Sequence, residues 1–262
     1  MSRMPLAFEC QGKRLGATLD TAPGSTGLLL VSGGNETRAG AFNGQSRLAA
    51  DIAAAGFPVF RFDRRGVGDS EGENREFRNS SRDIAAALDA FRAISPQVQR
   101  VVGFGNCDAA SALMLARGAG CDALILSNPW TLDEIATNGA PAAATPASLR
   151  ARYRRKLADP GEIWRLLTGR VDIKKLARGM AQAARPETSH SALASEMKAG
   201  LDGFSGPVTI LLAGRDRTAQ IFAERWDASD GRIARCEDAS HAYVEPHARI
   251  WLRERILGAL KG

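Results

Sequence analysis

The sequence predicts an α/β fold in which helices cover both faces of a mostly parallel sheet. Short apolar runs alternate with helical patterns along the chain, as they do where crossover helices join parallel strands. Each run ends in small or polar residues; the six runs are TGLLLVSGG, FPVFRFDRRG, QRVVGFG, CDALILSNP, PVTILLAGRD and RIARCEDASH. With 262 residues, of which 44% are hydrophobic and 24% charged, the chain can bury a substantial core.

Local patterns predict the other elements. The opening LAFECQGKRLGATLD is typical of a hairpin that turns near Gln11-Gly12. In GQSRLAADIAAAG and SSRDIAAALDAFRAI the apolar residues recur every three or four positions, which predicts two amphipathic helices. Ser80, followed three residues later by Asp83, predicts a capping box with the shorter acid at the start of the second helix.

The alternation stops between Trp130 and Phe204, where no convincing strand is present. Short helical patterns fill this segment, and ten Lys or Arg residues between positions 148 and 178 stand against three acidic ones. We expect residues 1–129 and 205–262 to form the core, and residues 130–204 to form a helical lid over the C-terminal edge of the sheet, where such folds bind ligands. The alternative is a solvated helical decoration.

The charge distribution argues against a nucleic-acid partner. The whole chain carries +6, and the basic segment alone accounts for this excess, so the rest is close to neutral. The start, MSRMPLAFECQGKRLG, has no signal-type apolar region, and no run approaches the ~18 apolar residues of a membrane span, so we expect a cytoplasmic protein. The cysteines are widely spaced without a metal-binding pattern, which predicts free thiols and no metal site; they are Cys10, Cys107, Cys121 and Cys236.

One turn carries the clearest chemical pattern. VVGFGNCDAASALMLARG predicts a strand, a tight turn at Cys107 and a helix of small residues. Gly105 and Ala109 complete the pattern G-x-C-x-A, a variant of the nucleophile elbow G-x-S-x-G, whose small residues let the central one adopt a strained backbone. A thiol held there projects above the sheet with a helix N-terminus behind it, and this location favours the thiolate.

Two other interpretations of this turn compete. Gly103 and Gly105 begin the dinucleotide pattern G-x-G-x-x-G, but its third glycine is replaced by Asp108, and no acid follows the next strand. Free cysteines are also commonly buried as core residues. The pattern G-x-C-x-A alone does not separate a nucleophile from a space-filling thiol.

The elbow requires an acid and then a histidine, each placed after a later strand. Asp216 follows the apolar run VTILLA, and His241 follows RIARCEDAS. Of the other histidines, His190 lies in the expected lid and His247 in the final helical pattern. We therefore expect Cys107 as the nucleophile, His241 as its base and Asp216 as the acid that orients the imidazole. Asp216 is also a candidate N-cap for the helix that follows it.

An oxyanion hole needs two backbone N–H groups beside the nucleophile. The first is expected from Asp108, directly after Cys107. The loop VSGGNETRAG follows the first central strand and carries glycines that let the backbone approach a substrate. Gly34 or Asn35 is the expected second donor.

Beyond these patterns, FRFDRRGVGDSEG resembles the D-x-R-G-x-G-x-S signature of α/β-hydrolases, and with the elbow, the acid and the histidine this resemblance covers nearly the whole chain. The chain further resembles the exosortase A system-associated hydrolases of type 1, in the glycine loop with Arg38, in AAAGFPVFRFDRRGVGDSEG, in the elbow CDAASA and in the pattern W…L…G…VD from Trp164 to Asp172. The resemblance implies an α/β-hydrolase fold with a lid, and a link to bacterial exopolysaccharide and protein-sorting loci. The chain departs from many hydrolases in Ser32, where they have histidine, and in Cys107, where they have serine.

These residues predict a cysteine-nucleophile hydrolase that needs no cofactor. A thiolate suits small-molecule acyl substrates with good leaving groups, such as esters and thioesters, better than unactivated amides. Arg38 and Trp130 are the expected substrate-binding residues. Two alternatives remain: transfer of the acyl group to a sugar or other alcohol, and a catalytically silent binding protein of the same fold. The basic lid either contacts an anionic substrate, carrier or membrane surface, or is a solvated face.

Overall fold

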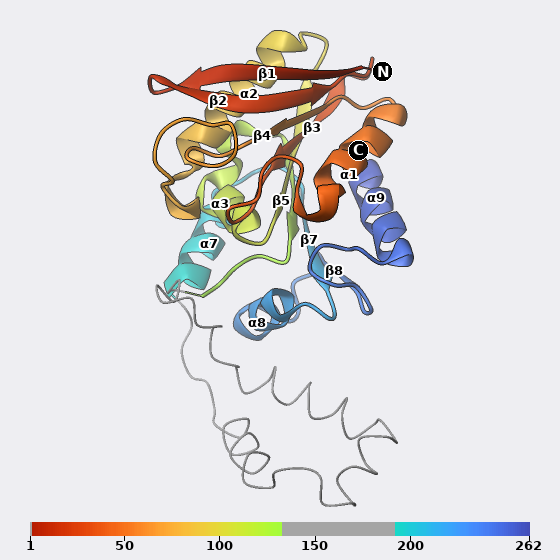
Figure 1. Cartoon of the computed structure of the whole chain (residues 1–262). Coiled ribbons are helices and arrows are strands. Elements are labelled where there is room, and N and C mark those ends of the chain that lie inside the picture. Colours follow the sequence, from red (N-terminus) through yellow and green to blue (C-terminus); the bar gives the residue numbers. More distant parts are fainter. Residues whose placement is uncertain (1, 133–191) are drawn as a thin grey trace, which may run out of the picture.

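The structure is a computed structural model that describes residues 2–132 and 192–262, and it is built on one eight-stranded sheet (Figure 1). The strand order is β1-β2-β4-β3-β5-β6-β7-β8. β1 pairs antiparallel with β2, and β2 with β4, whereas every other neighbouring pair is parallel. The strands are β1 (Arg3–Cys10), β2 (Lys13–Asp20), β3 (Thr26–Val31), β4 (Val59–Phe62), β5 (Arg100–Asn106), β6 (Ala123–Ser127), β7 (Val208–Ala213) and β8 (Ile233–Cys236). The prediction of a mostly parallel α/β sheet is confirmed.

The N-terminal hairpin turns at the residues that the sequence indicated. Gln11 and Gly12 join the two strands with φ values of 53° and 68°, and Cys10 pairs with Lys13 across the turn. Two successive left-handed residues match the twist of the flanking strands, which is why a glycine is favoured there. The hairpin adds an antiparallel edge beside β4, and the parallel strands continue from β4 to the other edge at β8.

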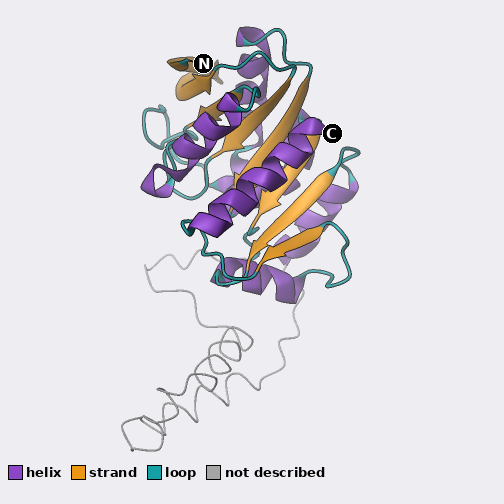
Figure 2. Cartoon of the chain, turned by 90° about the vertical axis from the view of Figure 1, so that its right-hand side faces the viewer, coloured by secondary structure: helices purple, strands orange, loops and turns teal. Residues whose placement is uncertain are grey.

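Helices cover both faces of the sheet (Figure 2). On one face, α1 (Gly44–Ala54) and α9 (Pro246–Lys261) contribute to a core cluster with residues of the central strands. The other face is covered by α2 (Ser81–Ile94), α3 (Asp108–Leu115), α7 (Ala192–Asp202) and α8 (Arg217–Arg225), whose buried side chains share a second cluster. Short 3-10 helices lie at Ala41–Asn43, Phe77–Asn79 and Arg117–Gly120.

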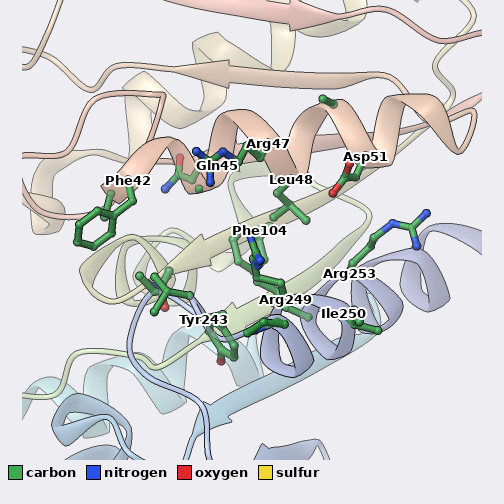
Figure 3. Close-up of a pocket in the computed structure, with 18 of the residues that line it drawn as sticks. Phe42, Gln45, Arg47, Leu48, Asp51, Phe104, Tyr243, Arg249, Ile250 and Arg253 are labelled. Carbon is green, nitrogen blue, oxygen red and sulfur yellow. The ribbon is translucent and has the colours of Figure 1, made fainter.

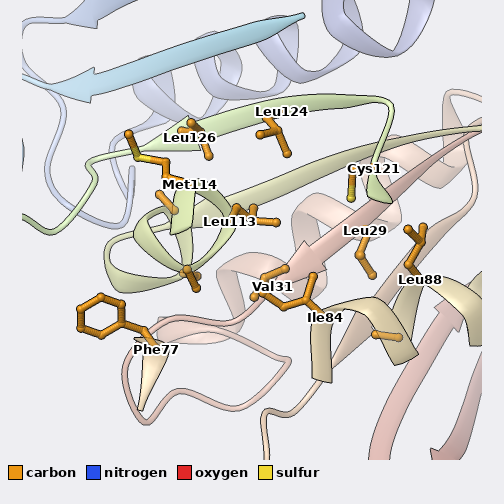
Figure 4. Close-up of a cluster of buried hydrophobic side chains, with 14 of the residues drawn as sticks. Leu29, Val31, Phe77, Ile84, Leu88, Leu113, Met114, Cys121, Leu124 and Leu126 are labelled. Carbon is orange, nitrogen blue, oxygen red and sulfur yellow. The ribbon is translucent and has the colours of Figure 1, made fainter. Parts of the chain in front are cut away.

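The two clusters together explain why the central strands are apolar along their whole length. Figure 4 shows Leu29 and Val31 of β3 together with Ile84 of α2 and Leu113 of α3, and all four side chains are fully buried. Burial of each such side chain contributes about 1.5–3 kcal/mol. The continuous run TGLLLV therefore arises because the strand is covered on both faces.

The start of α2 differs from the prediction. The Ser80 side chain makes no capping hydrogen bond and instead donates to the Glu76 carbonyl at 2.8 Å. Asp83 accepts from Arg65 Nη2 at 2.7 Å, and both side chains are buried. The predicted capping box is wrong because the buried Arg65 guanidinium needs a counter-charge, which Asp83 supplies.

The last part of the expected lid lies against the core. α7 falls inside the range 130–204, and its Leu193, Met197 and Leu201 side chains belong to the buried cluster beneath α3. Residues 133–191, which include the basic segment and the whole pattern from Trp164 to Asp172, lie outside the described residues. Among the described helices, none has the length and apolar character needed to cross a membrane.

The turn between β5 and α3 depends on Gly105, which has no side chain. A Cβ atom on Gly105 would lie 2.6 Å from the carbonyl carbon of Ala109 and 2.7 Å from its oxygen. Real Cβ atoms do not approach backbone this closely, so any larger residue forces the helix away from the strand. Glycine at this position lets α3 begin directly on top of β5.

Gly105→Ala is expected to lower the free energy of unfolding by about 1–3 kcal/mol, because the added methyl group overpacks the strand–helix contact. Urea unfolding followed by circular dichroism measures this loss. Gly258→Ala in α9 is the matched control, because a Cβ there meets nothing within 4 Å. That change is expected to stabilise the helix by about 0.5–1 kcal/mol. Equal effects of the two variants would contradict the packing argument.

Candidate active site

Cys107 occupies a strained corner at the C-terminal edge of the sheet. It lies between β5 and α3 with φ 62° and ψ −128°, a conformation that costs a non-glycine residue about 1–3 kcal/mol. Two hydrogen bonds hold this corner: the Cys107 N–H donates to the Ser127 carbonyl at 2.9 Å, and its carbonyl accepts from the Ala110 N–H at 3.1 Å. The turn therefore presents the thiol at the start of α3, as the G-x-C-x-A pattern predicts.

The environment of Cys107 differs from that of the other cysteines. Cys107 is half-buried, whereas Cys10, Cys121 and Cys236 are buried. Burial raises the pKa of the Cys121 thiol to about 12, and burial is also the main cause of the raised pKa values of Cys10 and Cys236. These three residues are therefore neutral core thiols near pH 7, which is the environment expected for space-filling cysteines.

His241 and Asp216 meet at the same edge of the sheet. His241 lies in the loop after β8, and its Nδ1 is 2.9 Å from Asp216 Oδ2. Asp216 follows β7 and is 8% exposed. Its Oδ2 also accepts from the Ala219 N–H at 3.0 Å, so the same oxygen caps α8 and orients the imidazole. The hydrogen bond from the Ala219 N–H therefore fixes the Asp216 carboxylate independently of its contact with His241.

The imidazole is held in its charged form. Burial of the His241 ring favours the neutral form, but hydrogen bonds to Asp216 and Cys107, together with the negative charges of these groups, outweigh burial and raise the pKa of His241 to about 10. The structure thus brings all three predicted triad residues together, because the same ring is hydrogen-bonded to both partners. Near pH 7 the His241 ring is therefore an imidazolium, and its Nδ1 lies 2.9 Å from Asp216 Oδ2.

Two asparagines that sequence reasoning missed fix the histidine loop. Asn106 Nδ2 and Asn128 Nδ2 both donate to the His241 carbonyl, at 3.2 and 3.3 Å. Asn128 Nδ2 also donates to Asn106 Oδ1 at 2.9 Å, and Asn128 Oδ1 accepts from the Ala213 N–H at 2.8 Å. The only signal in the sequence is that each asparagine ends or follows an apolar strand run. The network ties the histidine loop to the ends of β5, β6 and β7.

The expected oxyanion donors form a second network. The Gly34 N–H donates to Asp108 Oδ1 at 2.6 Å, so the Asp108 side chain accepts from the loop that faces the nucleophile. Arg64, 4% exposed, donates from Nη2 to Asp108 Oδ2 at 3.1 Å and also to the Gly34 carbonyl. The Asn35 N–H donates no hydrogen bond to any described residue. Arg64 was missed; its only sign in the sequence is the doubled arginine of FDRRG.

The loop after β3 approaches the turn at Cys107 closely. A Cβ on Gly33 would lie 2.6 Å from the Asn106 carbonyl oxygen, 3.0 Å from Asp108 Oδ1 and 3.6 Å from Cys107 Cβ. Only glycine fits this space. The close approach holds this loop against the turn at Cys107, where the Gly34 N–H donates to the Asp108 side chain.

The two expected substrate-binding residues have partners within the protein. Arg38 donates from Nε to Thr18 Oγ1 at 3.0 Å and from Nη2 to Asp69 Oδ2 at 2.7 Å, and its Nη1 pairs with Asp63. A substrate would therefore have to share the Arg38 donors. Trp130 is half-buried against the core, and its Nε1 donates to the Leu132 carbonyl at 3.0 Å. No group of His, Cys, Asp and Glu within residues 2–132 and 192–262 has the arrangement of a metal site.

The Cys107 thiol at a strained strand–helix turn, the His241 imidazole in the loop after β8 and the buried Asp216 carboxylate after β7 thus lie together at the C-terminal edge of the sheet. Residues 28–253 match the Alpha/beta hydrolase family. The chain therefore belongs to that family, and the expected α/β-hydrolase fold is confirmed. No curated protein sequence matches the chain.

Solved structures of low sequence identity share this fold. The Pyrococcus furiosus esterase Pf2001 superposes with a TM-score of 0.61 at 13% identity, over 99% of this chain and 90% of that one. Est1E from Butyrivibrio proteoclasticus, solved with ferulic acid, gives 0.62 at 14% identity, over 98% of this chain and 100% of that one. A thioesterase domain from the curacin biosynthetic pathway gives 0.58 at 16% identity, over 98% of this chain and 100% of that one.

The raised pKa of His241 predicts a ring that stays protonated well above neutrality. In an NMR titration, assigned by comparison with His241→Gln, the ring signals are expected to be constant from pH 6 to pH 8 and to move near pH 10. Because the pKa of His241 is raised in the folded state, protonated His241 contributes to the free energy of unfolding. This contribution is complete below the unfolded-state pKa of ~6.5 and is lost as pH rises through about 10.

Cys107→Ala is the matched variant for this titration. It removes one hydrogen bond and one negative charge from the ring, so the pKa of His241 is expected to fall while Asp216 still holds it above its ordinary value. A His241 ring that titrates near pH 6.5 in the wild type, or a His241 pKa that is unchanged in Cys107→Ala, would rule out the interaction between His241 and Cys107.

Proposed function

We propose that the protein is a cysteine-dependent hydrolase of activated acyl compounds, esters or thioesters, that works through Cys107, His241 and Asp216. The observation that supports this most is the contact of one imidazole with both Asp216 and Cys107, at the corner where Cys107 has a strained left-handed backbone. The esterase and thioesterase named among the structures of similar fold support the same class of substrate.

Acylation follows from the charge state of the site. The Cys107 thiolate attacks the acyl carbonyl carbon, a C–S bond forms, and the carbonyl electrons move onto oxygen. Collapse of this tetrahedral intermediate expels the alkoxide or thiolate leaving group, which takes its proton from the His241 imidazolium. Asp216 keeps Nδ1 hydrogen-bonded, so the proton that is delivered comes from Nε2.

Deacylation uses the same ring in the opposite sense. Once the sulfur is acylated its negative charge is lost, and with it one of the causes of the raised pKa of His241. The neutral ring then accepts a proton from water as the water attacks the thioester. Collapse releases the acid and restores the thiolate and the imidazolium. An alcohol in place of water makes the same enzyme an acyltransferase.

The developing oxyanion requires backbone donors. The Asp108 N–H, directly after Cys107, is one. The Gly34 N–H is the second donor in this proposal, and it is bound to Asp108 Oδ1 when no substrate is present. The oxyanion and the Asp108 carboxylate therefore compete for the same N–H. On its sequence motifs alone, we also propose that the enzyme serves a bacterial exopolysaccharide or exosortase system.

Cys107→Ala is expected to abolish the burst of p-nitrophenol that wild type gives with p-nitrophenyl acetate, because no acyl-enzyme can form. Mass spectrometry of the digested wild-type protein is expected to show one acetyl group on the peptide that contains Cys107. Cys10→Ala is the matched control, because Cys10 is a buried thiol at the far hairpin. A wild-type protein without a burst would favour a silent binding protein, and an unchanged burst in Cys107→Ala would disprove the assignment.

Asp108→Asn is expected to raise the burst rate constant by about tenfold, because a neutral side chain competes less well with the oxyanion for the Gly34 N–H and no longer repels it. Stopped-flow absorbance measures this rate. Asp69→Asn serves as the control, because Asp69 is an exposed carboxylate that pairs with Arg38. A slower burst in Asp108→Asn would show that the Asp108 carboxylate assists catalysis, and would contradict the proposed competition for the Gly34 N–H.

A further inference from the structure

A groove separate from the triad lies between α1 and α9 (Figure 3). Its volume is about 780 Å³, within the range of small-molecule sites. The buried side chains of Phe104, Tyr243 and Leu252 contribute to its lining, and Leu48 projects into it from α1. None of Cys107, His241 and Asp216 lines it, so the proposed acyl chemistry does not account for this groove.

Exposed apolar side chains gather around the groove. The five large hydrophobic residues that stand out as exposed in the described part of the chain are Met4, Phe42, Ile94, Val244 and Ile250. Three of them line this one groove: Phe42 is 79% exposed, Val244 47% and Ile250 57%. Scattered apolar residues need no explanation, but a cluster at the rim of a groove marks a binding site.

Phe42 is held out by its backbone. Phe42 and Asn43 adopt left-handed φ values of 52° and 58° in succession, just before α1 begins. Such conformations cost non-glycine residues free energy, and they persist where the surrounding structure fixes them. The strained turn keeps an aromatic ring at the groove instead of letting it fold onto the core.

The groove is also basic. Arg47 of α1 and Arg249 and Arg253 of α9 line it, and none of the three forms an ion pair with another described residue. Two carboxylates, Glu36 and Asp51, lie there as well, and the Glu36 carboxylate accepts from the Ala41 N–H at 3.3 Å. The three guanidinium groups exceed the two carboxylates by one, which leaves a net positive charge beside an apolar surface.

We propose that this groove binds a single-chain amphiphilic anion, a carboxylate with a medium or long hydrocarbon chain. The chain covers Leu48, Phe104 and the exposed rim residues, which removes their apolar surface from water. The carboxylate pairs with the arginines, whose planar guanidinium groups match its geometry. A neutral ligand would leave this positive charge unused, and a polar ligand would leave the apolar rim exposed.

The test is a fluorescence titration of the full chain with cis-parinaric acid and with its methyl ester. The acid is expected to bind about fivefold more tightly than the ester, because only the acid carries the charge that the arginines recognise. Ile250→Asp and Val244→Asp are expected to weaken binding of both probes by about tenfold or more, since each places a charge on the apolar rim. Arg253→Gln is expected to weaken binding of the acid alone.

Matched controls lie outside the groove. Ile94→Asp changes an exposed apolar residue at the end of α2, and Lys261→Gln removes a charge at the end of α9. Both are expected to bind the probes as wild type does, and circular dichroism verifies that every variant is folded. Cys107→Ala is expected to retain binding, so the groove is tested independently of the proposed acyl chemistry.

Three results would overturn the proposal. The first is probe binding by Ile250→Asp and Val244→Asp that matches binding by Ile94→Asp. The second is a wild-type dimer in sedimentation velocity that dissociates in Ile250→Asp, which would show that a second copy of the chain covers the groove. The third is equal affinity for the acid and the ester, which would remove the role of the arginines and refute the anionic class of ligand.

Discussion

The strained backbone of Cys107 is the constraint on which the rest of the site depends. A left-handed residue between a parallel strand and a helix is tolerated only where its neighbours leave room, and Gly105 and Gly33 provide that room by lacking side chains. The same turn starts α3 on top of β5 and presents the sulfur at the sheet edge. The same backbone turn therefore determines the conformational strain, the close packing of α3 on β5 and the position of the Cys107 thiol.

The second component of the site is the imidazole of His241, which lies in a loop 134 residues after Cys107 in the chain. The Asp216 carboxylate both caps α8 and orients the His241 ring. Asn106 and Asn128 donate hydrogen bonds to the His241 carbonyl. Because these contacts join the ends of three parallel strands, the arrangement of Cys107, His241 and Asp216 depends on the sheet as a whole. Parallel strands bring residues distant in sequence to one edge, which is why enzymes of this class place their sites there.

The two sides of the sheet have different chemical characters. The C-terminal edge gathers titratable groups, backbone donors and the Arg64–Asp108 pair, and we propose the acyl chemistry for this edge. The groove between α1 and α9 gathers exposed apolar side chains and arginines, and we propose the amphiphilic ligand for this groove. Asn106 and Ala242 line the groove and are the chain neighbours of Cys107 and His241, so the two regions adjoin without sharing a catalytic side chain.

The sequence by itself determined the strands, the hairpin turn at Gln11-Gly12 and the elbow around Cys107, because each follows from side-chain periodicity or turn chemistry over a few residues. It also indicated Asp216 and His241, since parallel strand ends meet at one edge. Only the tertiary structure decided how buried polar groups are paired: Asp83 with Arg65 instead of a helix cap, Asp108 with the Gly34 N–H, and both asparagines with the His241 carbonyl. A buried donor takes whichever acceptor packing brings near, and local sequence does not encode that neighbour.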